Sequence, residues 1–371
     1  MISNKTMTTL QLSENLYPID EVFMTFTQCL IKRSTQHEML FWLFEIIASA
    51  EDVLCGLLCI YLQFYSIGNK GLAKYVLRKS HKYKKDGNIK HLINMVNNMR
   101  LAKPTIDAYE VTQNSVIEVS PNKIYKSEPW VKCNPPYSFG LLKSIHANDR
   151  HNIGAYLNIM FKKHGFDETY NVITNYLVNV RGRKYDEMIL TKENFPNEIF
   201  LLSAIISNAN TIDNNSKAMR FVAVPQGDID KMLNHFTKKA DKYYLKLKER
   251  RLYSTHRKLG SGDYGRFHIE EGLEKASWYS WEYYCYNSTE WKKRFDKYSG
   301  KQNDETKKIV FLNDDCLEAF YDDGNAMEFD EQDCETQSKS LHEIYVYTDI
   351  NKWFSDLINE CLVQVMHNIK I

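Results

Sequence analysis

Residues 39–67, MLFWLFEIIASAEDVLCGLLCIYLQFYSI, decide the fold of this chain. Of these 29 residues, 22 are apolar or aromatic, and the charged ones are Glu45, Glu51 and Asp52. We interpret the stretch as two helices joined by a tight turn, with Ser49 capping the second helix and Asp52 in its first turn. Because each helix is apolar on nearly every side, we expect other elements to enclose both of them.

Helical patterns continue on both sides of this stretch. A capping box at Thr35-x-x-Glu38 opens the helix that contains Met39. Further helices are expected at 18–33, 70–85, 89–102, 105–112, 153–160, 170–180, 196–208, 229–247, 278–286, 314–321 and 350–366, and a short strand at 309–311. Since no fixed repeat period is visible, the sequence predicts an all-α (mainly α) fold. It would be an irregular multi-helix bundle or a solenoid-like array, with at most a minor strand near residue 310.

The same patterns divide the chain into five parts. We expect a disordered N-terminus (1–15), an N-terminal helical domain (16–115), a linker (116–136), a middle helical domain (137–258) and a mostly helical C-terminal region (259–371). The linker is predicted because it holds four of the eight prolines. The middle domain would end in a basic amphipathic helix, and the C-terminal region would carry an acidic loop.

Composition places few limits on function. The formal net charge is +1 and 43% of the residues are hydrophobic, which is typical of a globular protein without a bulk preference for one partner. The longest nearly uncharged run, residues 53–67, has 15 residues, whereas a membrane span needs about 20. We therefore predict no membrane insertion. The eight cysteines form no Cys-x-x-Cys pair, and without a secretory signal we expect reduced thiols in the cytosol.

No complete catalytic or metal-binding motif is present in the sequence. LGSGDYGRF, residues 259–267, resembles the glycine-rich loop of a protein kinase, but a basic helix precedes it and the other kinase motifs are missing. The histidines have no zinc spacing, and Asp322-Asp323-Gly324-Asn325 lacks the register of a calcium loop. We therefore predict no catalytic residues, no cofactor and no metal. The ten acids of residues 313–336 are interpreted as a solvated loop, or as an arm that covers a basic face of the same protein.

Two rows of basic residues give the strongest indication of a binding surface. Within each row the residues recur every four positions, which places them on one side of a helix. The rows are Lys74, Arg78 and Lys82, and further along Lys238, Lys242, Lys246 and Arg250. Such rows neutralise phosphates and bind nucleic acid without sequence preference, although a solvated helix face is the alternative. Four tyrosines close to the rows are candidates for stacking on bases: Tyr83, Tyr243, Tyr244 and Tyr253.

A concentration of aromatic residues follows the second row. If Trp278, Trp281 and Tyr284 are exposed, they form a candidate surface for a protein partner. The alternative is that they pack against the rest of the C-terminal region, because aromatic side chains bury large areas.

Several segments resemble a helical protein family encoded by giant nucleocytoplasmic large DNA viruses. They are FWLFEI (41–46), IYLQFYSIGNKGLAKYVLRK (60–79), KPTIDAYE (103–110), WKKRFDKY (291–298) and DEQDCETQSKS (330–340). The resemblance implies synthesis in an infected eukaryotic cell and residence in the host cytoplasm, the viral factory or the virion. It supplies no catalytic residues.

These observations support three hypotheses about function. The first is a non-enzymatic viral scaffold that binds a protein partner, since no complete catalytic set is present. The second is a nucleic-acid-binding accessory factor in viral replication or transcription, which uses the basic rows. The third is an enzyme whose site is assembled from residues far apart in the sequence.

Overall fold

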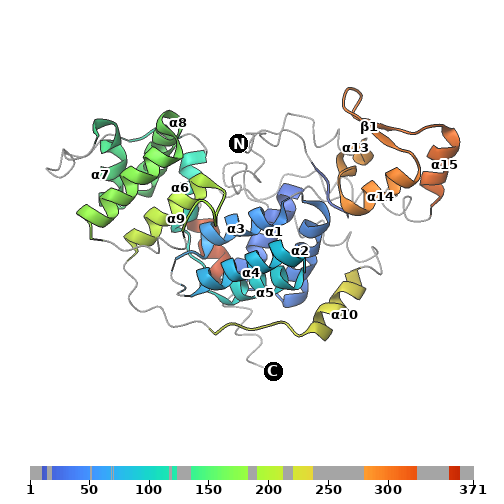
Figure 1. Cartoon of the computed structure of the whole chain (residues 1–371), viewed down its shortest axis with the longest axis horizontal. Coiled ribbons are helices and arrows are strands. Elements are labelled where there is room, and N and C mark those ends of the chain that lie inside the picture. Colours follow the sequence, from blue (N-terminus) through green and yellow to red (C-terminus); the bar gives the residue numbers. More distant parts are fainter. Residues whose placement is uncertain are drawn as a thin grey trace. The chain divides into compact units, whose positions relative to one another are not determined.

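The structure is a computed structural model of the chain. It describes residues 11–14, 19–50, 52–67, 69, 71–116, 119–122, 135–182, 190–211, 220–236, 280–323 and 351–359. These residues are mainly helical, and the sheet among them is a two-stranded hairpin (Figure 1). The predicted mainly α fold class is therefore confirmed.

The chain divides into two compact units, and each unit draws on separate parts of the sequence. Unit 1 lies within Met1–Cys29, Ser34–Val53 and Gln226–Thr348, and unit 2 within Leu30–Arg33, Leu54–Pro225 and Asp349–Ile371. Among the described residues, no helix is both long and apolar enough to cross a membrane.

The first six helices follow the sequence patterns closely. They are α1 (Ile19–Lys32), α2 (Gln36–Ser49), α3 (Val53–Phe64), α4 (Leu72–Asp86), α5 (Lys90–Leu101) and α6 (Asp107–Val116). The hydroxyl of Thr35 accepts a hydrogen bond from the backbone N–H of Glu38 at 3.2 Å, so the predicted cap of α2 is confirmed. The prediction that Ser49 caps α3 is wrong, because Ser49 is the last residue of α2 and its hydroxyl accepts from the backbone N–H of Glu14. Asp52 precedes α3 instead of lying in its first turn.

The middle of the chain adds further helices to unit 2. They are α7 (Phe139–Ala147), α8 (Arg150–Asn175) with a π-helical extension (Tyr176–Val180), and α9 (Glu198–Asn210). Helix α8 and its extension contain the two helices predicted at 153–160 and 170–180, and between them Gly165 has a φ of 74° and a non-helical conformation. Helix α6 packs against both α8 and α9 (Figure 1). In the core of unit 2, the rings of Phe64 and Tyr109 lie 4.6 Å apart, and Trp353 from the C-terminal helical segment 351–359 lies 5.5 Å from Tyr109.

The described elements between Gln226 and Asp322 belong to unit 1. They are α10 (Gln226–Phe236), α13 (Trp281–Cys285), α14 (Thr289–Lys297), the antiparallel strands β1 (Lys301–Asn303) and β2 (Lys308–Val310), and α15 (Asp314–Asp322). Strand β2 is the predicted strand near residue 310, and β1 is its unpredicted partner. Part of the predicted acidic loop is helical, since Asn313 caps α15 by accepting from the backbone N–H of Cys316.

The aromatic residues of this C-terminal part form a hydrophobic cluster. It contains Leu12, Trp281, Tyr283, Tyr284, Cys285, Trp291, Phe295 and Phe320. Trp281 and Tyr284, two members of the candidate partner surface, are each 6% exposed. A protein partner could therefore contact little of either side chain. For Trp281 and Tyr284 the structure supports the alternative, which is packing within the C-terminal hydrophobic cluster. Trp278, the third member, lies outside the described residues.

Candidate nucleic-acid interface

Helix α4 has one apolar and one basic face. Leu72, Tyr75 and Val76 are buried, and the hydroxyl of Ser80 is satisfied by the carbonyl of Val76 at 3.0 Å. The helix is closed at its C-terminus by Gly87, whose φ of 66° is a left-handed conformation that glycine adopts without strain. Burial of the apolar face turns the basic positions outward.

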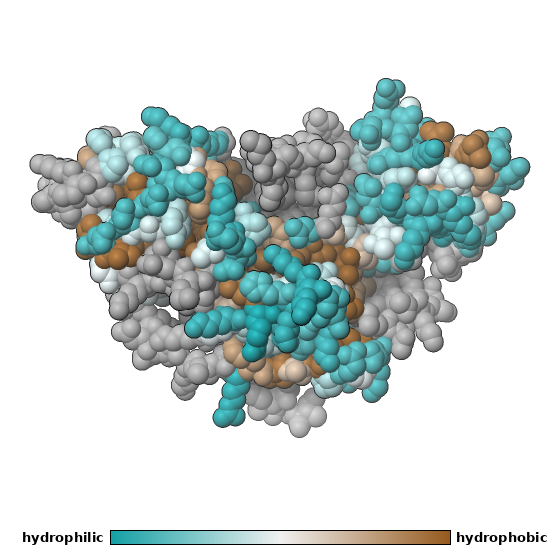
Figure 2. Space-filling view, in the orientation of Figure 1, coloured by the Kyte–Doolittle hydropathy of each residue, from teal (hydrophilic) through white to brown (hydrophobic). Residues whose placement is uncertain are grey.

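The predicted first basic row occupies this outward face. Lys74, Arg78 and Lys82 are all exposed, and they line one shallow groove of about 450 Å³. The groove is completed by Leu77, His81 and Lys85. Figure 2 shows hydrophilic side chains gathered over α4, beside hydrophobic surface. The structure thus brings this row together on one face, as its four-residue spacing predicts.

No acidic side chain neutralises this face within the part of the chain that the structure describes. None of the ion pairs found there involves Lys74, Arg78, Lys82 or Lys85. The repulsion among the cations affects their neighbour Lys79. Burial lowers the pKa of Lys79, and the charges of Lys82 and Arg78 lower it further. An anion placed in the groove would relieve this repulsion.

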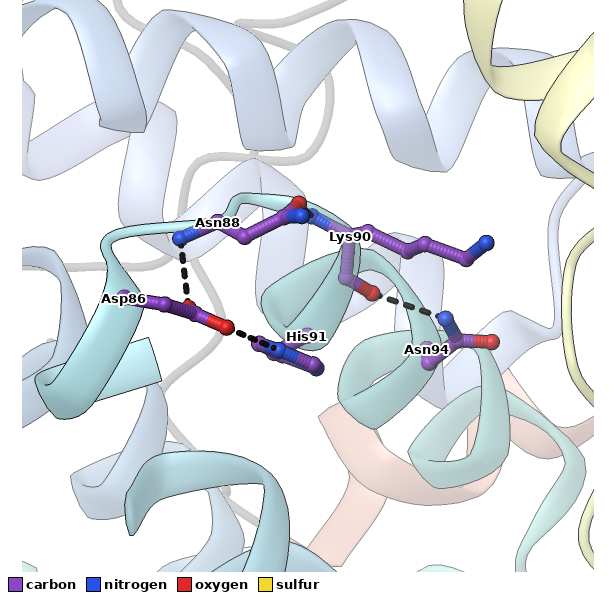
Figure 3. Close-up of polar contacts among 5 residues, drawn as sticks. All are labelled: Asp86, Asn88, Lys90, His91 and Asn94. Atoms are coloured by element: carbon purple, nitrogen blue, oxygen red, sulfur yellow. Dashed lines mark hydrogen bonds and ion pairs between the residues drawn. The ribbon is translucent and has the colours of Figure 1, made fainter. Parts of the chain in front are cut away.

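Asp86, the acid nearest to the row in sequence, is the last residue of α4, and its carboxylate contacts residues of the turn that leads to α5 (Figure 3). Its carboxylate accepts from the backbone N–H of Asn88 at 2.9 Å and lies 2.9 Å from Nε2 of His91. These two contacts lower the pKa of Asp86. The side chain of Asn88 in turn accepts from the backbone N–H of Lys90 at 3.0 Å, at the start of α5. The carboxylate therefore stabilises the turn rather than screening the groove.

Sequence reasoning missed three residues of the groove. Leu77, His81 and Lys85 follow the row at helical spacings of three or four residues, and a search that admits both spacings would have found them. Instead, the four-residue step from Lys74 ends at Lys82, because its next position, Asp86, is acidic.

Of the other predicted binding residues, Tyr83 lies in α4 and is partly exposed, whereas Tyr243, Tyr244 and Tyr253 lie outside the described residues. Lys238, Lys242, Lys246 and Arg250 lie outside the described residues, as does the glycine-rich stretch 259–267. Within the described part of the chain, no group of three His, Cys, Asp or Glu side chains is positioned to hold a metal ion.

Comparison with known proteins adds no assignment, since no family model, curated protein or solved structure matches this chain. The resemblance to proteins of giant viruses therefore stays a prediction.

Proposed function

We propose that this chain is a nucleic-acid-binding accessory protein that binds the phosphate backbone with the outer face of α4. The observation that carries the proposal is that the basic row and the neighbouring Lys85 place four exposed cations along one groove. Lys74, Arg78, Lys82 and Lys85 have no ion-pair partner among the described residues. Arginine and lysine without acidic partners are the groups that release counterions when they neutralise phosphates.

The length of the row suits a phosphate backbone. Lys74 and Lys85 are eleven positions apart, which corresponds to about 16 Å along an α-helix. One strand of a duplex carries a phosphate about every 3.4 Å of helix axis, so about five phosphates span the same length. Four contacts would give a slope of about −3 to −4 for log K against log salt on duplex DNA.

The biological setting is proposed on the family resemblance alone. We place the binding in viral replication or transcription, in the host cytoplasm or the viral factory. The scaffold hypothesis remains the alternative, and it would gain support if the protein did not bind nucleic acid.

The proposal predicts a salt dependence that is specific to α4. Binding of the full chain to a random-sequence 20-bp DNA duplex is measured by fluorescence anisotropy from about 50 to 200 mM salt. Replacing Lys74, Arg78 and Lys82 with alanine removes three phosphate contacts, so the slope should become shallower by about 2.7.

The matched control removes the same charge elsewhere. Lys163, Lys301 and Lys308 are exposed and lie outside α4, and their triple alanine variant should keep the wild-type slope. Equal losses in the two triple variants would show that bulk charge, and not α4, drives binding. An absence of binding both to this duplex and to a 20-nucleotide single strand at about 50 mM salt, where phosphate-driven affinity is highest, would contradict the proposal and favour the scaffold.

A further inference from the structure

An aromatic pair lies at one end of the basic row. The ring of Phe221 stacks on the ring of Tyr75, with centroids 4.3 Å apart and planes inclined by 10°. Tyr75 is only 6% exposed, whereas Phe221 is 39% exposed. Phe221 therefore has one face of its ring on Tyr75 and keeps more than a third of its residue surface open to solvent.

The backbone that carries Phe221 is fixed to α5 by two buried asparagines. The amide of Asn98 donates to the carbonyl of Val222 at 2.8 Å and accepts from its N–H at 2.9 Å. The side-chain oxygen of Asn94 accepts from the N–H of Val224 at 2.8 Å. Asn98 also donates to the hydroxyl of Tyr75 at 3.1 Å, so one amide positions both partners of the stack. The exposed ring is therefore held in a defined place.

The stack is next to the cations of α4. Tyr75 follows Lys74 directly, and the guanidinium of Arg78 and the ammonium of Lys79 each lie 5.4 Å from the centre of its ring. A Cβ built on Gly71 would lie 3.8 Å from Cζ of Phe221, which places this ring over the first turn of α4. An anchored aromatic face and a row of cations are the two parts from which sequence-tolerant single-strand sites are built.

We propose that Phe221 is a base-stacking platform and that the α4 face binds single-stranded nucleic acid, with phosphates on the basic row and one base on Phe221. This inference rests on the proposed function and names its substrate class. An unpaired base presents a free π-face to an aromatic side chain, whereas the bases of a duplex are already stacked on each other.

The test compares single-stranded with duplex DNA on the full chain. Affinities for a 20-nucleotide oligothymidine and for a random-sequence 20-bp duplex are measured by anisotropy at one salt concentration. The Phe221→Ala variant should lose roughly 5- to 150-fold in affinity for the single strand, the range for one lost base stack, and less than about 2-fold for the duplex. Phe221→Trp should keep the single-strand affinity.

Val222→Ala is the matched control, since Val222 is 49% exposed and its contacts with Asn98 use only the backbone. This variant should bind both DNAs like the wild type. If Phe221→Ala does not fold, the added tryptophan emission of Phe221→Trp, taken as the difference from wild type, should be quenched by the single strand and not by the duplex.

Two results would overturn the inference while the proposed function stands. One is equal wild-type affinity for the two DNAs with no effect of Phe221→Ala, and the other is an equal loss for both DNAs in that variant, which a merely structural ring would produce. Failure of the wild type to bind either DNA would instead contradict the proposed function itself.

Discussion

At the scale of single residues, Asn98 connects parts of unit 2 that are far apart in the sequence. Its side-chain nitrogen lies within hydrogen-bond distance of the hydroxyl of Tyr75 and of the carbonyls of Asn94 and Val222. Its oxygen accepts from the N–H of Val222, 124 positions away. Hydrophobic periodicity predicted a helix over 89–102. It did not indicate that Asn98 binds Val222, because a polar residue within a helical pattern does not reveal its hydrogen-bond partners. The anchoring of Phe221 could therefore not be predicted from the sequence.

We predict that Asn98→Ala lowers the free energy of unfolding by about 2–4 kcal/mol, measured by urea denaturation. Asn98 is fully buried, and its removal leaves the hydroxyl of Tyr75 and the backbone of Val222 without partners, at about 1–3 kcal/mol for each unsatisfied group. Asn208→Ala is the control, since its amide donates to the carbonyl of Ala204 one turn away, and it should cost less than about 1 kcal/mol. Equal losses would argue against an anchoring role of Asn98.

At the scale of elements, the sequence predicted those helices that have local signals. The alternation of apolar and polar positions predicted α4 and α5, and Thr35 marked the start of α2. Strand β1 was missed because Lys301–Asn303 is short and polar, and only its pairing with β2 makes it a strand. Helix α14 was also missed, since its apolar residues Trp291 and Phe295 are too few to define a periodic pattern.

The close packing of α8 on α6 predicts that alanine at Gly154 is destabilising, although alanine has a higher helix propensity than glycine. A Cβ at Gly154 would lie 2.4 Å from Cβ of Asn114 and 2.6 Å from the carbonyl oxygen of Val111, both in α6. The higher helix propensity of alanine would stabilise α8 by about 1 kcal/mol. A Cβ this close to atoms of α6 would, however, force the two helices apart. We expect a net loss of about 1–3 kcal/mol in the free energy of unfolding.

The control for this substitution is Asn158→Ala in the same helix. Asn158 is partly exposed, so the alanine should leave stability unchanged or raise it by up to about 0.5 kcal/mol, as measured by urea denaturation. A Gly154→Ala variant more stable than the wild type would show that α6 and α8 are not held at this distance.

At the scale of the whole molecule, the sequence predicted domains that follow one another along the chain. In the structure, each of the two units is instead made of three separate sequence ranges. The core of unit 2 illustrates the reason, because Trp353 packs near Phe64 and Tyr109 from the N-terminal third of the chain. Hydrophobic periodicity describes one helix at a time and carries no information about contacts of such long range. The candidate site was partly predictable for the same reason, since the row on α4 is local and the stack with Phe221 is not.

The stability of the whole molecule provides the last prediction, which concerns the stretch 39–67. Leu58 lies in α3 and is 2% exposed. A carboxylate at this position would be buried without a partner, at a cost of several kcal/mol or more, which approaches the total stability of about 5–15 kcal/mol of a folded protein. Leu58→Asp should therefore abolish the soluble, cooperatively melting protein. Leu312→Asp, the same change at a site that is 76% exposed, should leave soluble yield and melting temperature near wild type. A wild-type melting temperature for Leu58→Asp would mean that α3 is not enclosed, and the assignment of the core to residues 39–67 would be wrong.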